Sequence, residues 1–384
     1  MIPSKAKNIL TNFSLLVGVF VFCFILAEIM IRLFFPSPQS PNIFDEIIGY
    51  KYRPNSSVSF FVQGKEIKNK VNSFGFLDEE HSYEKPLEKY RIVFIGDSFT
   101  EATNVLRQNT FPKILEKELN EIYENKVETI NLGSNGFGTA HEYLTLKEYG
   151  LKFSPDLVIL LFIENDLENN LVKFGSDINP AFDVVGGELL QIRTPRPLKG
   201  SGLRSFISNN LQFPRFLVHQ FSKISFFKNI FINQNLISAV KDSPEDAIPF
   251  SRRSYSEVFQ EDEDILKSWR ITKALIKEIA ELSKDNHSDF LVVVPDGPPD
   301  PDAEASLLRE YPELQNIDLD LVRNTILDYF QEEKINYIDL FSAVQNVKES
   351  LHYPSEDGGH YNLAGHQLMA KAIFDHIQEN NIIK

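Results

Sequence analysis

The sequence predicts a doubly wound α/β domain preceded by a transmembrane helix, and three observations lead to this prediction. Short apolar runs alternate with amphipathic stretches between residues 90 and 380. Such alternation is typical of right-handed β–α–β units in a parallel sheet. A run of 20 uncharged residues, 8–27, stands near the N-terminus. Polar, turn-forming segments follow the predicted strands, at the sheet edge where open α/β domains bind ligands.

Composition excludes several classes of protein. The chain has 384 residues, with 39 Lys and Arg against 54 Asp and Glu, which gives a net charge of −15. This acidic balance argues against a nucleic-acid partner, because phosphate contacts need clustered Lys and Arg. Hydrophobic residues make up 42% and charged residues 24%, so the chain is not wholly disordered. One cysteine, Cys23, leaves no internal disulfide and no cysteine-based zinc site.

An N-terminal membrane anchor is predicted over residues 8–35. A helix of the length of the uncharged run spans about 30 Å, the thickness of a bilayer core. Pro36 and Pro38 then end the helix. A cleaved signal peptide is the alternative, but the apolar run is long for one and no small-x-small cleavage site follows it. Lipid attachment at Cys23 is a weaker alternative, because the bulky Phe22 precedes it.

Flanking charges predict the orientation of this anchor. Lys5 and Lys7 precede the apolar run, and only Arg32 follows it closely. The positive-inside rule then places residues 1–7 in the cytoplasm as a short tail and the bulk of the chain in the periplasm or outside the cell. The exported part would contain no cysteine, which suits an oxidising compartment.

Five apolar runs predict the strands of the sheet. Continuous runs of this length are typical of parallel strands that helices cover on both faces. The predicted strands are 92–95, 129–132, 157–162, 290–294 and 337–340. Apolar residues at helical spacing predict helices between and after them. These helices are 111–122, 265–282, 319–330 and 363–377.

Two further segments flank or interrupt this domain, which is predicted to run from 90 to 384. Residues 36–89 are predicted to be an extension that packs on it. Residues of approximately 170–260 break the alternation after the third strand and are predicted to be an insertion. Within the insertion, 191–241 carries eight basic residues, seven phenylalanines and no acidic residue. Two interpretations stay open: aromatic packing on the core, or a basic–aromatic surface that contacts anionic headgroups or covers a site as a lid.

Polar segments follow the first, second, third and last predicted strands. They are 96–100, 133–136, 164–166 and 357–360. Because the carboxyl ends of parallel strands meet at one edge of the sheet, we expect all four segments to converge there.

The residue types in these segments suit acyl transfer. Ser98 can act as a nucleophile only with a base within hydrogen-bond reach, and His360 suits that task. Asp357 stands three residues before His360, close enough to orient its ring. A tetrahedral intermediate also needs preorganised donors. The backbone amides of Ser98 and Gly133 and the side-chain amide of Asn165 are the candidates.

The same residues resemble the four blocks of the SGNH, or GDSL-type, hydrolase family. The family's blocks are a GDS serine, a glycine after the second strand, an asparagine in a GxND segment and a C-terminal DxxH. Here they read, in the family's order, Gly96-Asp97-Ser98, Gly133, Asn165-Asp166 and Asp357-x-x-His360. Two positions depart from the pattern: Ile163 stands for the glycine of the third block, and Phe99 for the leucine of GDSL.

This resemblance covers about residues 70–380 and implies a flavodoxin-like three-layer fold that hydrolyses or transfers an ester-linked acyl group. It implies that Ser98 is the nucleophile, that Gly133 and Asn165 are oxyanion donors, and that Asp357 and His360 form the acid–base pair. No metal or organic cofactor is implied.

We therefore predict a membrane-anchored bacterial serine esterase whose main domain lies outside the cytoplasm. Its partners would be the membrane and an O-acyl ester, an O-acetyl ester first of all, on a surface or secreted glycan or lipid. Two alternatives stay open. One is an O-acetyltransferase that modifies a cell-surface polysaccharide with the same residues. The other is a catalytically silent relative that only binds glycans.

Overall fold

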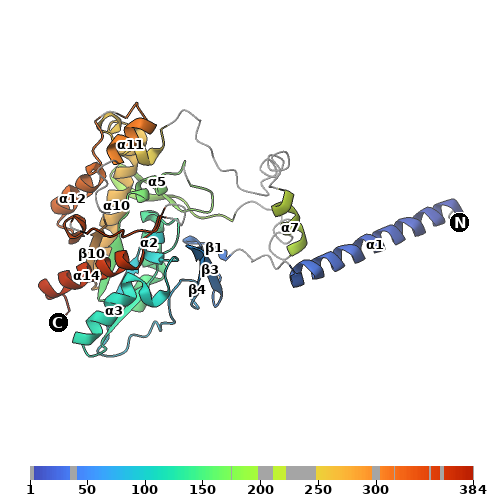
Figure 1. The fold of residues 1–384 in the computed structure, drawn as a ribbon, viewed down its shortest axis with the longest axis horizontal. Helices are drawn as coiled ribbons and strands as arrows, with labels where there is room; N and C mark the ends of the chain where they lie inside the picture. The colour runs from blue at the N-terminus through green and yellow to red at the C-terminus, as the bar shows by residue number, and fades with distance from the viewer. Residues whose placement is uncertain are drawn as a thin grey trace. The chain divides into compact units, whose positions relative to one another are not determined.

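Figure 1 shows the chain as a computed structural model. It describes residues 4–34, 41–173, 175–197, 211–221, 248–295, 303–314, 316–345, 347–354 and 359–383. The chain divides into two compact units. One comprises Met1–Ser40 and Leu198–Ala247, and the other comprises Pro41–Pro197 and Ile248–Lys384.

The first unit contains the long apolar helix α1 (Ser4–Phe34). Its stretch Asn12–Phe34 has a mean hydropathy of 2.6 and is almost entirely unburied. By length and composition α1 is able to cross a membrane, a property that anchors and N-terminal signal sequences share. The helix predicted from the uncharged run is therefore present.

Helix α7 (Gln212–Phe221) packs against α1 within this unit. The backbone amides of Gln212 and Phe213 donate to the Glu28 carboxylate at 2.9 and 2.8 Å. The rings of Phe24 and Phe213 meet edge to face, with centroids 5.5 Å apart. Glu28 thus caps the first turn of α7, where unpaired amides and the helix dipole favour a carboxylate. Most of the basic segment 191–241 lies outside the described residues.

The second unit is built on a five-stranded parallel sheet of order β11-β10-β7-β5-β6. Its strands are β5 (Tyr90–Ile95), β6 (Val127–Asn131), β7 (Leu157–Leu161), β10 (Asp289–Val294) and β11 (Tyr337–Asp339). All five predicted strands and the doubly wound α/β class are confirmed. When the five strands are numbered by their order in the chain, they lie side by side in the sheet in the order 2-1-3-4-5. This is the flavodoxin-like arrangement, whose switch point lies between β5 and β7.

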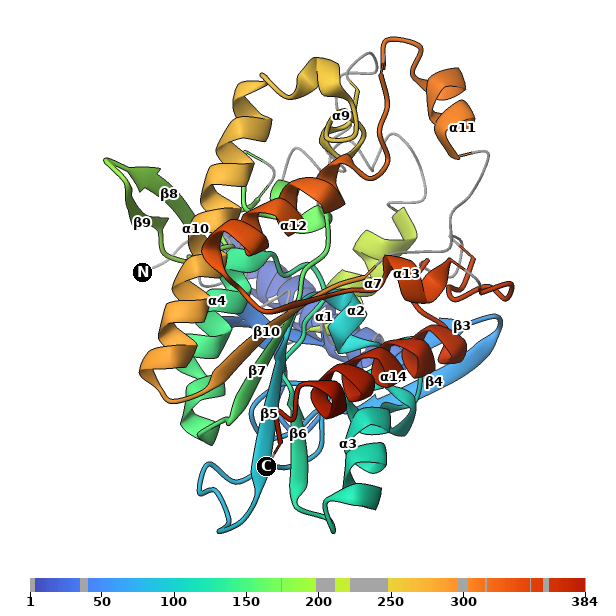
Figure 2. The ribbon, with the colours of Figure 1, turned by 90° about the vertical axis from the view of Figure 1, so that its left-hand side faces the viewer.

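Helices cover both faces of the sheet, as Figure 2 shows. Alternate residues of one strand enter two separate cores: Val93 and Ile95 pack into one, and Ile92 and Phe94 into the other. All four side chains are fully buried, which explains why the strand is apolar throughout. The first core includes α4 (Thr139–Glu148), α10 (Glu263–Asp285) and α12 (Leu321–Glu333). The second includes α3 (Phe111–Ile122) and α14 (Leu363–Glu379).

Helix α4 was not among the predicted helices, although the other four were. Eight of its ten residues are buried, but they include His141, Glu142 and Thr145. An apolar period therefore does not mark its buried face, and the sequence pattern gives no helical signal there.

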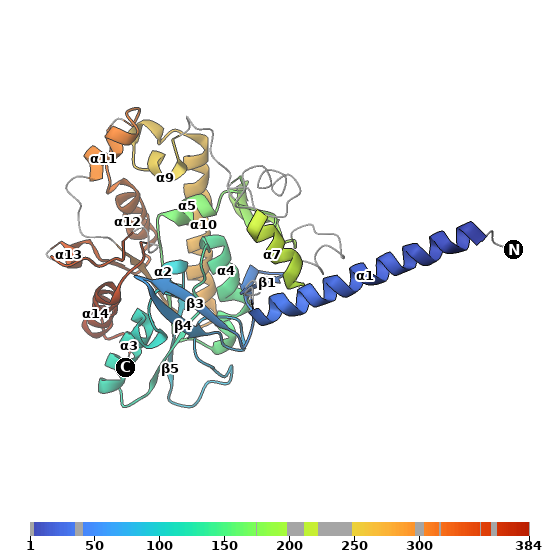
Figure 3. The same cartoon turned by 45° about the vertical axis from the view of Figure 1, so that its right-hand side comes forward.

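The extension before the sheet forms two hairpins, visible in Figure 3. They are β1 (Asn42–Asp45) with β2 (Gly49–Tyr52), and β3 (Ser57–Val62) with β4 (Lys65–Lys70). The Tyr50 hydroxyl donates to the Asn135 carbonyl at 2.7 Å, and the Asn69 side chain donates to the Val105 carbonyl at 2.9 Å. Ile48 joins the core that contains α4. The extension therefore contacts the loops that follow β5 and β6.

A third hairpin follows the sheet's β7 in the chain. It joins β8 (Ala181–Val185) to β9 (Glu188–Arg193) through Gly186 and Gly187, whose φ angles are +62° and +89°. Two glycines between apolar runs are a hairpin signal, because glycine adopts positive φ without strain. This hairpin lies in the part of the chain predicted as an insertion.

A buried ion network supports β5 and β6 from the side of the extension. His81 lies between two carboxylates, with Nδ1 2.7 Å from Glu128 Oε1 and Nε2 3.0 Å from Asp78 Oδ2. Arg91, fully buried, donates from Nε to Glu128 Oε2 at 2.7 Å. Burial opposes the charge on His81, but the two carboxylates outweigh it and raise the pKa of His81 to about 9.

We predict that this network stabilises the fold in a pH-dependent way. The folded-state pKa of His81 lies above its usual 6.5, so its contribution is complete below pH 6.5 and is lost as the pH rises through 9. A rise of that size corresponds to about 3 kcal/mol. Urea unfolding of full-length His81→Gln in detergent, followed by the single tryptophan, Trp269, should show a large deficit at pH 6 that shrinks by pH 9.5. A deficit that is equal at both pH values would contradict this.

We also predict that Glu28 holds α7 on α1. In a Cys23→Ser background, the double variant Phe24→Cys, Phe213→Cys should form a disulfide cross-link between α1 and α7. Adding Glu28→Ala should lower the yield of this cross-link several-fold, since helix caps contribute about 1 kcal/mol. Mass spectrometry of the cross-linked peptides measures the yield. A pair at positions 16 and 213 is the control, because Leu16 lies about 12 Å further along α1. Equal cross-linking of both pairs would exclude this packing.

Candidate active site

Ser98 stands at the carboxyl end of β5, as the first residue of the short helix α2 (Ser98–Glu101). Asp97 caps this helix and accepts a hydrogen bond from the Phe99 amide at 2.9 Å. Gly96 makes the tight turn between strand and helix. A Cβ at this position would lie 2.1 Å from the Thr100 hydroxyl oxygen, so no other residue fits without a shift. After β5, Gly96 thus allows the tight turn, Asp97 caps α2, and Ser98 begins the helix.

His360 reaches Ser98 from the opposite end of the chain. Its Nε2 lies 2.7 Å from Ser98 Oγ, a distance at which the hydroxyl donates to an unprotonated nitrogen. The His360 ring also packs on Phe99, with centroids 4.8 Å apart. The backbone holds the histidine in place: the Tyr353 amide donates to the His360 carbonyl at 2.8 Å. Asp357, predicted to orient this ring, lies outside the described residues.

Asn165 approaches the same turn from β7. It is the first residue of α5 (Asn165–Asn169), and its Nδ2 donates to Asp97 Oδ2 at 3.0 Å. The same carboxylate oxygen lies 3.4 Å from Ser98 Oγ. Burial raises the pKa of Asp97, against the hydrogen bonds from Asn165 and Phe99 and the nearby His360, which lower it. Asp97 therefore links the segments after β5 and β7.

Gly133 follows β6 and is held by Asn131. The Gly133 amide donates to Asn131 Oδ1 at 2.9 Å, and Asn131 Nδ2 donates to the Thr100 carbonyl at 2.7 Å. A Cβ on Gly133 would lie 2.6 Å from Thr100 Cβ and 2.7 Å from the Glu101 backbone nitrogen. Glycine is thus required for the loop after β6 to approach α2 this closely.

Two fully buried carboxyl groups lie near Asp97, in addition to the buried Glu101. Glu142 on α4 and Asp166 on α5 are both fully buried. Within the described part of the chain, neither carboxylate oxygen of Glu142 has a hydrogen-bond partner. Burial, together with the charges of Asp166 and Asp97, raises the pKa of Glu142 well above its usual range, and burial and Asp97 do the same for Asp166. Glu142 is therefore neutral well above pH 4.5.

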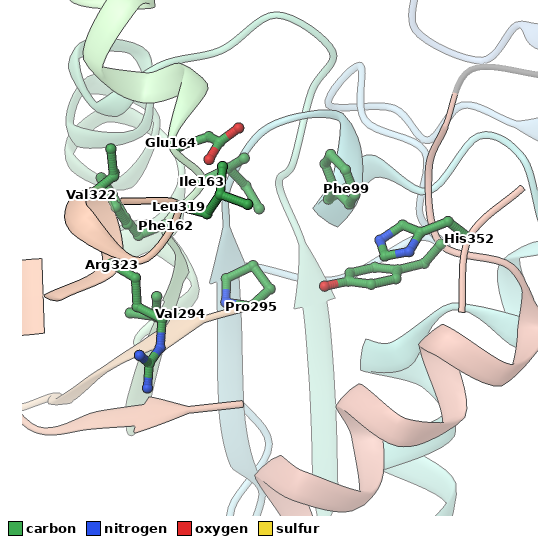
Figure 4. Close-up of a pocket in the computed structure, with 11 residues that line it drawn as sticks. Phe99, Phe162, Ile163, Glu164, Val294, Pro295, Leu319, Val322, Arg323 and His352 are labelled. Atoms are coloured by element: carbon green, nitrogen blue, oxygen red, sulfur yellow. The ribbon is translucent and has the colours of Figure 1, made fainter. Parts of the chain in front are cut away.

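A cavity of about 200 Å³ lies at the carboxyl ends of the strands, and Figure 4 shows the residues that line it. Most of its lining is apolar. Of its charged residues, Arg323 donates to Asp339 Oδ1 at 2.9 Å, and Glu164 accepts from the Tyr255 hydroxyl. The lining residues are Phe99, Phe162, Ile163, Glu164, Val294, Pro295, Leu319, Val322, Arg323, His352 and Tyr361.

Among the described residues, Asp78, Glu79 and His81 are the one group of side chains close enough to share a metal ion. Both imidazole nitrogens of His81 already face carboxylates, and Lys113 Nζ lies 3.9 Å from Asp78 Oδ1. This group is better described as part of the ion network beneath β6 than as a cation site.

The structure brings all four predicted segments together, as far as it describes them. His360 and Asn165 meet the turn that carries Ser98, and in the segment 133–136 the Ser134 amide donates to the Gly96 carbonyl at 3.2 Å. Sequence reasoning did not find the contacts of Asn131 or the cavity beside Phe99. It named Asp97 only as part of the Gly96-Asp97-Ser98 block, whereas the Asp97 side chain also accepts a hydrogen bond from Asn165. The one available signal for the contacts of Asn131 was a polar residue near the end of a predicted buried strand, because a buried polar side chain needs hydrogen-bond partners.

Comparison with known proteins gives one family match. The model of the GDSL-like lipase/acylhydrolase family matches residues 92–239, a range that includes Ser98, Gly133 and Asn165 and ends before His360. No curated protein matches the chain significantly.

Three of the solved structures that are similar to this one cover most of the chain at low identity. A catalytic mutant of an acetylxylan esterase from Geobacillus stearothermophilus is 12% identical, with a TM-score of 0.39, over 77% of this chain and 96% of that one. An alpha/beta hydrolase from the Lake Arreo metagenome is 13% identical, with a TM-score of 0.39, over 79% and 100%. A member of the lipolytic G-D-S-L family from Veillonella parvula is 11% identical, with a TM-score of 0.37, over 75% and 98%.

We predict that Glu142→Gln stabilises the protein at high pH. The folded-state pKa of Glu142 is raised, so the wild type loses stability as the pH rises above the ordinary value of 4.5, whereas glutamine does not ionise. The thermal midpoint of the variant should exceed that of the wild type by a few degrees at pH 8 and match it at pH 4. The exposed Glu121→Gln serves as the control, with the same small difference at both pH values. A variant less stable than wild type at pH 8 would contradict the argument.

Proposed function

We propose that this chain is a serine esterase of the GDSL-like, or SGNH, type. The observation that carries the proposal is the 2.7 Å approach of His360 Nε2 to Ser98 Oγ. A serine hydroxyl becomes a useful nucleophile when a neighbouring imidazole takes its proton. The family match over 92–239 supports the same activity.

The reaction would run in two steps. Ser98 Oγ attacks the ester carbonyl while Nε2 of His360 takes the hydroxyl proton, and the same proton then goes to the departing alcohol. This leaves an acyl group on Ser98. A water molecule, activated by His360, cleaves the acyl-enzyme and releases the acid. Asp357, three residues before His360, is proposed to accept from Nδ1 and fix the tautomer of the ring.

Three donors are proposed to bind the oxyanion. The Ser98 amide is the first N–H of α2 and has no intrahelical acceptor. Asn165 Nδ2 has a second hydrogen besides the one given to Asp97. The Gly133 amide donates to Asn131 in this structure, so its participation requires that bond to be shared or exchanged.

The proposed setting is the outer side of a membrane to which α1 anchors the domain, with the N-terminus in the cytoplasm. The proposed substrate is an O-acyl ester of a surface or secreted glycan or lipid. Transfer of the acyl group to a sugar hydroxyl would use the same residues. Product analysis distinguishes the two, because hydrolysis yields free acid and transfer yields an acylated sugar.

We predict that a fluorophosphonate probe labels the full-length protein at Ser98 and that Ser98→Ala abolishes both labelling and hydrolysis of p-nitrophenyl esters. The loss of kcat should be about 10⁴-fold or more, as for other serine hydrolases. The control is Ser134→Ala, which changes a buried serine after β6. This variant should still be labelled at Ser98. Equal ester hydrolysis by wild type and Ser98→Ala would end the proposal.

We further predict that Asn165→Ala lowers kcat by about 10²–10³-fold, because an oxyanion donor acts mainly on the transition state. KM should change little. Asn169→Ala, at the other end of α5, is the matched control and should retain kcat. If both variants lose activity equally, Asn165 acts by holding the helix and not as a donor.

A further inference from the structure

We propose that the cavity beside Phe99 is an acyl-chain pocket that makes the enzyme prefer acyl groups of four to six carbons over acetyl. This inference rests on the proposed esterase function and deepens it. It changes the acyl group that we expect on the substrate, since the sequence favoured an O-acetyl ester.

The cavity is tied to the proposed catalytic residues by direct sequence neighbours. Phe99 follows Ser98, Glu164 precedes Asn165, and Tyr361 follows His360. All three neighbours line the cavity, although the residues that they adjoin come from distant parts of the chain. The cavity therefore lies beside the site where the ester carbonyl would bind.

Its walls are suited to an apolar chain. Seven of the lining side chains are aliphatic, aromatic or proline, and Tyr361 adds a further ring. In Figure 4, Phe99 lies on one side of the cavity, and Phe162 and Val322 lie across from it. The charges on the wall are engaged within the protein, since Arg323 pairs with Asp339 and Glu164 binds Tyr255. The wall also carries the His352 imidazole and the Tyr361 hydroxyl, so its polar groups are few beside the seven apolar side chains.

The size of the cavity sets the length of the chain. An apolar cavity of about 150 Å³ holds a benzene molecule, which has six carbons. A cavity of about 200 Å³ therefore accepts a chain of similar carbon number and leaves a longer one partly outside. Each methylene buried against apolar walls should raise kcat/KM by about fourfold.

The test is a chain-length series with the full-length protein in detergent: p-nitrophenyl acetate, butyrate, hexanoate and decanoate. We expect kcat/KM to rise about 15-fold from acetate to butyrate, which adds two methylenes, to peak at four to six carbons and to fall at ten. Leu319→Trp, at the partly exposed edge of the cavity, should remove the gain in kcat/KM for butyrate and hexanoate relative to acetate.

Val322→Ala enlarges the same cavity and should move the optimum to longer chains, so the two variants shift the profile in opposite directions. Asp328→Trp, on the exposed side of α12, is the control and should keep the wild-type profile. A flat or acetate-preferring profile in an enzyme that labels at Ser98 would overturn the pocket and leave the esterase intact. No hydrolysis of any ester and no label at Ser98 would instead overturn the proposed function, and the pocket with it.

Discussion

The hydrogen bond between Ser98 Oγ and His360 Nε2 is the interaction on which the functional account depends. The two residues are 262 positions apart, and the sheet brings them together. Because β5 and β7 are neighbours at the point where the strand order reverses, their carboxyl ends open into a crevice. Ser98 and Asn165 enter it from these two strands, and His360 closes it from the segment before α14. The parallel sheet thus places Ser98 and Asn165, and the segment before α14 adds His360.

A second constraint is the cluster of buried carboxyl groups around Asp97. Taking several acids out of water is costly, and the cost is lowest when most of them are neutral. Burial raises the pKa of Glu142, Asp166 and Asp97, but at Asp97 the hydrogen bonds from Phe99 and Asn165 oppose the rise and favour the charged form. A negative charge on Asp97 would lie next to Ser98 and near His360, where it would stabilise an imidazolium.

Sequence patterns predicted the sheet well because its strands are buried on both faces, so runs such as Leu157–Leu161 contain no polar residue. Ser98 and His360 were identified as partners through motif order, and the structure brings them within hydrogen-bond distance. Helix α4 was missed because its buried face is polar. The contacts of Asn131 and the cavity beside Phe99 depend on side-chain packing between distant segments, which no local pattern encodes. Asp357 stays a prediction, since it lies outside the described residues.

The most direct measurement is the second-order rate at which a fluorophosphonate inactivates His360→Gln compared with wild type. If Nε2 of His360 takes the proton of Ser98, the rate should fall by about 10²–10⁴-fold, while circular dichroism shows the same fold. An unchanged rate in the folded variant would mean that the serine reacts without this histidine, and the account of the site would be wrong.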